Sequence, residues 1–171
     1  MNLLTVEQIS KSYGELLLFS NISFGINKNQ KIALIAKNGS GKTSILNIVA
    51  GKDRTETGQV TSRKGIAISF LEQEPRLDTK LTVEETIFAS GNPILNVIAS
   101  YEEAMKNPED EIAYQAAFEE MERLNAWDFE TQYKQILFKL QLTDLKQQVK
   151  VLSGGQKKRL ALAKALINKP D

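Results

Sequence analysis

The sequence contains no cysteine and no histidine, and these two absences exclude several kinds of chemistry. Without cysteine the chain has no disulfide, no thiol nucleophile and no thiolate metal site. Without histidine it lacks the commonest metal ligand and the commonest general base. Any chemistry must therefore depend on carboxylates, lysines, hydroxyls and backbone groups.

Long apolar runs are also missing, since no stretch approaches the roughly 18 uninterrupted apolar residues of a membrane span. The first 14 residues include the acidic Glu7 and do not show the basic start and apolar run of a targeting peptide. The 171 residues, 42% hydrophobic and 25% charged, suit a globular domain with a substantial core. We therefore expect a cytoplasmic protein without direct membrane insertion.

The net charge of +1 conceals a strong segregation of charge along the chain. Residues 1–71 hold nine Lys and Arg against four Asp and Glu, and residues 131–171 hold nine against two. Residues 102–130 reverse the balance, with ten acidic against two basic residues. The basic ends are either an anion-binding surface or a solvated lysine face, whereas the acidic middle argues against direct binding of nucleic acid there.

The first part of the chain has the pattern of short strands around one helix. Five short stretches rich in Ile, Val, Leu and Phe are expected to be strands: 3–9, 22–26, 31–36, 58–61 and 65–71. The helix is expected to begin near Lys42 and to end at Gly51 as a C-cap.

From residue 81 onward the apolar residues recur with helical spacing. Thr82 and Glu85 have the spacing of a capping box, and Asn107 followed by Pro108 resembles a helix cap with a first-turn proline. The sequence therefore predicts an all-helical lobe after a strand-rich core.

The stretch ALIAKNGSGKTSIL combines an apolar segment, a glycine-containing loop and a helix start. This order suits a loop whose backbone N–H groups surround a phosphate chain. Lys42 would reach the β- and γ-phosphates, and the Thr43 hydroxyl would bind Mg²⁺. The first glycine of the GxxxxGK[ST] pattern is replaced by alanine. The predicted nucleotide-binding residues of this loop are Ala36, Lys37, Asn38, Gly39, Ser40, Gly41, Lys42, Thr43 and Ser44.

A second candidate phosphate contact is LSGGQ at residues 152–156, directly before the helical stretch QKKRLALAKALIN. Its glycines leave backbone amides open at a helix N-terminus. The alternative is a glycine-rich turn with an ordinary serine cap. The predicted contact residues are Ser153, Gly154, Gly155 and Gln156.

With AKNGSGKT as a Walker A motif and LSGGQKKR as a signature motif, the chain resembles the ATP-binding cassette (ABC) family. The resemblance implies ATP and Mg²⁺ as cofactors, Tyr13 as the aromatic platform for adenine, and Gln73 in FLEQEP as a Q-loop residue that senses the Mg²⁺ bound by Thr43 or the attacking water. It also implies a head-to-tail sandwich, in which the signature motif of this cassette contacts the ATP held by a second cassette of the same full-length chain.

Within that family the strings SFLEQEP and NAWDFE and the long helical stretch between Gln73 and Leu152 are similar to the ABC-F group, and in particular to its Uup-like branch. Such proteins carry two cassettes, lack membrane domains and act on ribosomes or RNA in translation. The resemblance therefore implies the ATP-binding part of a translation-associated ATPase. A membrane-transporter ATPase subunit and a natural, non-catalytic binding module are the alternatives.

The resemblance implies an α/β P-loop fold, with a mixed sheet, additional antiparallel strands and a helical subdomain, truncated before the Walker B strand. The expected division is a nucleotide-binding core at 1–80, a helical subdomain with an ABC-F-like insertion at 81–151, and the signature motif with its helix at 152–171. The sequence shows no Walker B aspartate, catalytic glutamate or switch histidine, because Asp171 follows Asn-Lys-Pro and not an apolar strand. We expect an N-terminal fragment of the first cassette that hydrolyses no ATP alone.

Overall fold

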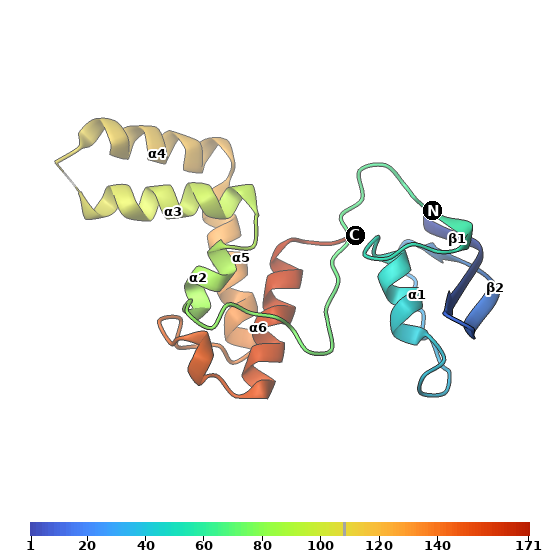
Figure 1. The fold of residues 1–171 in the computed structure, drawn as a ribbon. Coiled ribbons are helices and arrows are strands. Elements are labelled where there is room, and N and C mark those ends of the chain that lie inside the picture. Colours follow the sequence, from blue (N-terminus) through green and yellow to red (C-terminus); the bar gives the residue numbers. More distant parts are fainter. Residues whose placement is uncertain (108) are drawn as a thin grey trace. The chain divides into compact units, whose positions relative to one another are not determined.

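A computed structural model describes residues 1–107 and 109–171, which form two compact units (Figure 1). The first unit comprises Met1–Phe70 and Pro170–Asp171, and the second comprises Leu71–Lys169. The helix that follows LSGGQ belongs to the second unit.

The first unit is a three-stranded antiparallel sheet with one helix. Its elements are β1 (Asn2–Tyr13), β2 (Leu16–Asn27), α1 (Lys42–Val49) and β3 (Thr57–Ser62), and the strand order is β2-β1-β3. Val6 lies opposite Phe24 on one side and Val60 on the other, which fixes the register of the central strand. The predicted strands at 3–9, 22–26 and 58–61 are therefore confirmed.

Helix α1 packs its apolar side chains with those of the sheet. The core consists of Leu4, Val6, Ile9, Phe19, Ile45 and Ile48. Burying side chains of this size is the main contribution that holds α1 in place, at roughly 1.5–3 kcal/mol for each one. The C-cap of α1 is Ala50 and not Gly51, which comes one position later with φ of 71°, the left-handed conformation that glycine commonly adopts just after a helix.

The predictions of strands at 31–36 and 65–71 are wrong, because neither segment belongs to a strand among the described residues. Ile35 is 90% exposed and Ile68 is 49% exposed. The physical reason is that a strand needs a hydrogen-bonded neighbour, and an apolar sequence alone does not supply one. Ala67 does make two backbone contacts with Asp171: it accepts from the Asp171 N–H at 3.0 Å and donates to the Asp171 carboxylate at 2.9 Å.

The second unit is helical. Its elements are α2 (Val83–Phe88), α3 (Pro93–Lys106), α4 (Glu111–Arg123), α5 (Ala126–Lys139), a 3₁₀ turn (Val149–Val151) and α6 (Gly154–Ile167). The predicted capping box is confirmed, because Thr82 accepts from the Glu85 N–H while Glu85 accepts from the Thr82 N–H. The cap of α4 is Asp110 and not Asn107, which ends α3, whereas the predicted first-turn Pro108 lies outside the described residues.

One apolar core holds these helices together. It includes Ile87 of α2, Leu95 and Ile98 of α3, Met121 of α4 and Leu160 of α6, all with no exposed surface. Helices α3 and α4 run side by side as an antiparallel hairpin (Figure 1). No helix within 1–107 or 109–171 is both long and apolar enough to cross a membrane.

Candidate functional site: the phosphate loop and the signature turn

The loop before α1 contains two glycines in the left-handed backbone conformation. Gly39 and Gly41 have φ values of 82° and 84°, which side-chain-bearing residues adopt only with strain. At Gly41 a Cβ atom would also lie 2.8 Å from Phe19 Cδ1 and 3.1 Å from Leu18 Cβ, whereas at Gly39 it would meet nothing within 4 Å. Gly41 is thus required by both its φ and its neighbours, while the space around Gly39 is open.

The Lys42 side chain bonds back to the start of the loop. Its Nζ donates to the carbonyl oxygens of Ala36 and Lys37, both at 2.7 Å. The Ser40 hydroxyl donates to the same Lys37 oxygen at 2.8 Å. The ammonium group therefore lies within the loop, although Ala36 stands where the motif has glycine.

The first turn of α1 offers donors without competing acceptors. Gly41 is its N-cap and supplies no side-chain hydrogen bond, and the first turn has no acidic residue. Helix N-termini in this state carry unpaired N–H groups and a partial positive charge, which favour an anion. Thr43 in this turn is exposed, and Ser44 is half-buried. Asn38 and Gly39 lie together in one turn.

Tyr13 ends β1 in the same unit and is 60% exposed. Its register partner Leu16 lies three residues before Phe19 on β2, which is about 10 Å along the strand from the ring beside Gly41. The Lys11 Nζ lies 5.8 Å from the centre of the Tyr13 ring and forms an ion pair with Asp53 at 3.0 Å. The hydrogen bond from Lys11 lowers the pKa of Asp53.

Phe19, Leu18 and Lys11 are supporting residues that the sequence analysis missed. Phe19 is buried in the core of the sheet, and its ring limits the space at Gly41. No local pattern could have identified it, because the contact joins β2 to a loop more than 20 residues later.

The LSGGQ segment forms the start of α6 with a complete capping box. Ser153 accepts from the Gln156 N–H at 3.2 Å, and the Gln156 side chain accepts from the Ser153 N–H at 2.9 Å. A Cβ at Gly154 or Gly155 would meet nothing within 4 Å, and neither residue has a positive φ. The helix cap therefore explains why Ser153 and Gln156 occupy their positions. It does not explain why positions 154 and 155 are glycine.

The two residues predicted to act on Mg²⁺ belong to different units. Thr43 belongs to the first unit, and Gln73 is an exposed residue of the second. Within the described ranges, 1–107 and 109–171, no group of three or more acidic residues could hold a metal ion.

Comparisons with known proteins agree with these motifs. The family model described as "ABC transporter" matches residues 19–171. The uncharacterized ABC transporter ATP-binding protein YfmR of Bacillus subtilis (strain 168) is 39% identical over 178 residues, which cover 100% of this chain and 28% of YfmR. The energy-dependent translational throttle protein EttA of Mycobacterium tuberculosis (strain ATCC 25618 / H37Rv) is 28% identical over 98% of this chain and 31% of EttA. The chain thus spans less than a third of these relatives.

A solved structure described as the ATP-binding subunit of an ABC transporter matches with a TM-score of 0.71 and 19% identity, over 98% of this chain and 63% of the other. A nucleotide-free ATP-binding cassette from an ABC transporter matches with a TM-score of 0.62 and 24% identity, over 99% and 66%. These matches show that the fold is that of a P-loop cassette, as expected from the sequence. Together with the family match over most of its length, they establish that the chain belongs to the ABC transporter family of ATP-binding domains.

Proposed function

We propose that residues 36–44 bind the phosphates of ATP with Mg²⁺. The observation that carries this proposal is the position of the Lys42 ammonium inside a loop with two left-handed glycines, at a helix start without a side-chain cap or an acidic residue. Lys42 exchanges its carbonyl partners for phosphate oxygens, the first-turn N–H groups donate to the same phosphates, and Thr43 supplies a hydroxyl ligand to Mg²⁺. Tyr13 stacks on the base.

We further propose that Ser153, Gly154, Gly155 and Gln156 contact ATP held by a second cassette. The support is the pair of glycines that the local fold does not require. Residues without side chains at a helix start allow another surface to approach the backbone N–H groups closely. For Gln73 we propose the role of a sensor of Mg²⁺ or of the attacking water.

The experiment for the first proposal is equilibrium binding of a fluorescent ATP analogue to the 171-residue chain with and without Mg²⁺. Lys42→Ala is expected to weaken binding at least tenfold, because the loop loses its ammonium group. Lys28→Ala is the matched control, since it removes one positive charge from an exposed turn of the same unit. If both variants bind the ATP analogue as tightly as the wild type does, the proposed role of Lys42 is wrong.

For the longer protein we propose a role in translation, as an ABC-F ATPase. The support is the alignment with EttA, whose name describes a translational throttle, and the long helical segment between Gln73 and the signature motif. The 171-residue chain alone is expected to bind nucleotide without turnover, since activation of water needs a group to orient it. Phosphate release by this chain, abolished in Lys42→Ala, would contradict that expectation.

The competing function is that of an ATPase subunit of a membrane transporter. Its support is the similarity of this chain to the zinc import ATP-binding protein ZnuC of Jannaschia sp. (strain CCS1). The two sequences are 31% identical over 100% of this chain and 57% of ZnuC. Fractionation of cells that express the longer protein separates the two candidates. Co-sedimentation with ribosomes in the presence of a non-hydrolysable ATP analogue supports the translation role, and recovery with membranes supports the transporter.

A further inference from the structure

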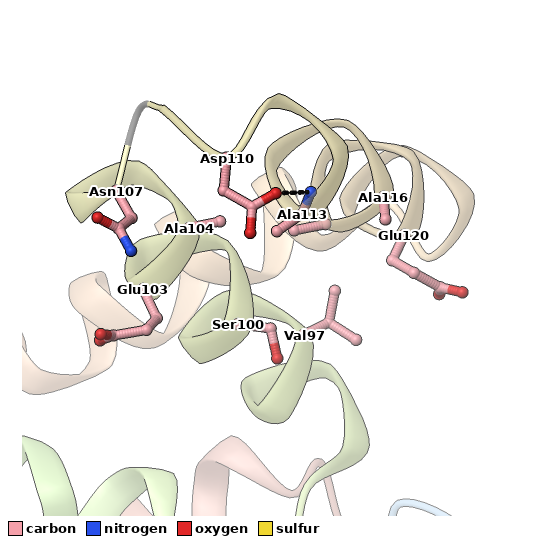
Figure 2. Close-up of a pocket in the computed structure, with 10 residues that line it drawn as sticks. Val97, Ser100, Glu103, Ala104, Asn107, Asp110, Ala113, Ala116 and Glu120 are labelled. Atoms are coloured by element: carbon pink, nitrogen blue, oxygen red, sulfur yellow. Dashed lines mark hydrogen bonds between the residues drawn. The ribbon is translucent and has the colours of Figure 1, made fainter.

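The α3–α4 hairpin carries a groove that has no part in nucleotide binding. The groove has a volume of about 590 Å³ and is lined by residues of both helices. Its walls consist largely of small side chains, namely Ser100 and Ala104 of α3 and Ala113, Ala116 and Ala117 of α4. Figure 2 shows Ala104 and Ala113 pointing toward one another across the groove, with Glu103 and Glu120 pointing outward on opposite sides.

An aromatic cluster holds the two helices in place beside the groove. Tyr101 of α3 lies edge-on to Trp127 with ring centres 4.9 Å apart, and its ring centre lies 5.7 Å from that of Tyr114 of α4. Phe118 of α4 lies 5.9 Å from Trp127. Aromatic contacts of this kind are specific in geometry, so the groove is a fixed feature of the hairpin.

The charge of the hairpin is strongly negative. Residues 93–123 contain eight acidic and two basic residues, a net charge of −6. The two basic side chains pair with the acids beside the groove, Lys106 with Glu103 at 2.7 Å and Arg123 with Glu120 at 2.6 Å. All four side chains are about half exposed or more, and exposed pairs of this kind contribute little, so another cation can replace Lys106 or Arg123 at low cost.

Asp110 adds a third carboxylate at the groove. Its Oδ1 accepts from the Ala113 N–H at 3.0 Å, which caps α4 (Figure 2). Small residues between two helices allow a third helix to approach closely, and acidic edges attract a positively charged one. Phosphate backbones are repelled by the same charge, which argues against RNA as the occupant.

We propose that this groove is a docking site for a basic amphipathic helix of a protein partner. The apolar face of that helix packs on the alanine-lined floor, and its Lys or Arg side chains pair with Glu103, Asp110 and Glu120. The proposal does not depend on nucleotide binding, because none of the groove residues belongs to the phosphate loop or the signature turn.

The test measures binding of a labelled Leu/Lys amphipathic peptide of about 20 residues to the 171-residue chain by fluorescence anisotropy. Ala116→Leu, which fills the exposed groove, and the double variant Glu103→Lys/Glu120→Lys are each expected to weaken binding at least tenfold. The matched controls are Asn96→Leu, which adds an apolar side chain on α3 outside the groove lining, and Glu15→Lys, which makes one Glu→Lys change, half the charge change of the double variant, in the first unit.

Thermal unfolding and ATP-analogue binding of each variant show whether the fold is intact. The proposal predicts that the controls bind as the wild type does, and that a peptide with Glu in place of Lys does not bind. It is overturned if Ala116→Leu and the double variant, both folded, keep wild-type affinity. It is also overturned if a single-stranded RNA of similar length binds the wild type and Ala116→Leu weakens that binding.

Discussion

At the scale of single residues, Gly41 has the least freedom in the phosphate loop. It combines a φ of 84° with a close approach to Phe19 and Leu18. Gly41→Ala is therefore expected to lower the free energy of unfolding by about 2 kcal/mol, from the left-handed backbone and the displaced Phe19 ring together. Urea denaturation measures this change.

Gly39→Ala is the control for that substitution. Gly39 has the same backbone strain, with φ of 82°, but open space around the added methyl group. It is expected to cost only about 1 kcal/mol. Equal losses for the two variants would show that contact with Phe19 does not constrain the loop.

Glu102 provides a prediction about pH. Burial raises the pKa of its carboxyl above the ordinary value of 4.5, with further contributions from Glu84 and Glu130, while Lys134 opposes them. A raised carboxyl pKa means that the folded chain binds the proton more tightly than the unfolded chain, so stability falls as pH rises through the window above 4.5. Glu102→Gln is thus expected to stabilise the chain at pH 7, by roughly a few tenths of a kcal/mol, because the group is partly exposed.

The free energies of unfolding of the wild type and Glu102→Gln are measured by urea denaturation at pH 7 and again near pH 4. There the wild-type carboxyl is largely protonated in both states, so the gain from glutamine should disappear. A gain of equal size at both pH values would assign the effect to packing or helix propensity.

At the scale of elements, α6 contains two glycines in its first turn that its own fold does not need. Gly155→Ala is expected to leave the stability of the chain unchanged or to raise it by about 0.5 kcal/mol, because alanine favours helix. The same variant is expected to lower ATP turnover of the longer protein proposed above, because the methyl group blocks the approach of the second nucleotide. Denaturation of this chain and phosphate release by the longer protein measure the two effects separately.

Gln156→Ala is the reference variant for this prediction, because it is expected to lower the stability of the chain, unlike Gly155→Ala. It removes the side chain that caps the Ser153 N–H, so it is expected to lower stability by about 1 kcal/mol. If Gly155→Ala destabilises the chain as much as Gln156→Ala does, the glycines serve the helix itself.

Elements with local signals were predictable from the sequence. The Thr82–Glu85 capping box, the helix that begins at Lys42 and the glycine after it each depend on residues a few positions apart. The segments 31–36 and 65–71 have equally apolar sequences, but a strand requires a neighbour from elsewhere in the chain. The Phe19 contact at Gly41 and the groove between α3 and α4 depend on tertiary packing and could not be predicted from local patterns.

At the scale of the whole molecule, the segment 31–36 leaves apolar side chains in water. Ile32, Leu34 and Ile35 are 47%, 39% and 90% exposed, next to the phosphate loop in the chain. Contiguous apolar residues with unpaired backbone groups favour association between molecules. We therefore expect the 171-residue chain to self-associate as its concentration rises.

Ile35→Lys tests this expectation, because it places a charge at the most exposed of the three positions. It is expected to reduce self-association in sedimentation velocity without lowering the thermal midpoint, since Ile35 has few contacts to lose. Leu166→Lys, which changes a 43% exposed apolar residue on α6, controls for the added charge. If both variants reduce association equally, net charge is the cause and segment 31–36 is not the contact surface.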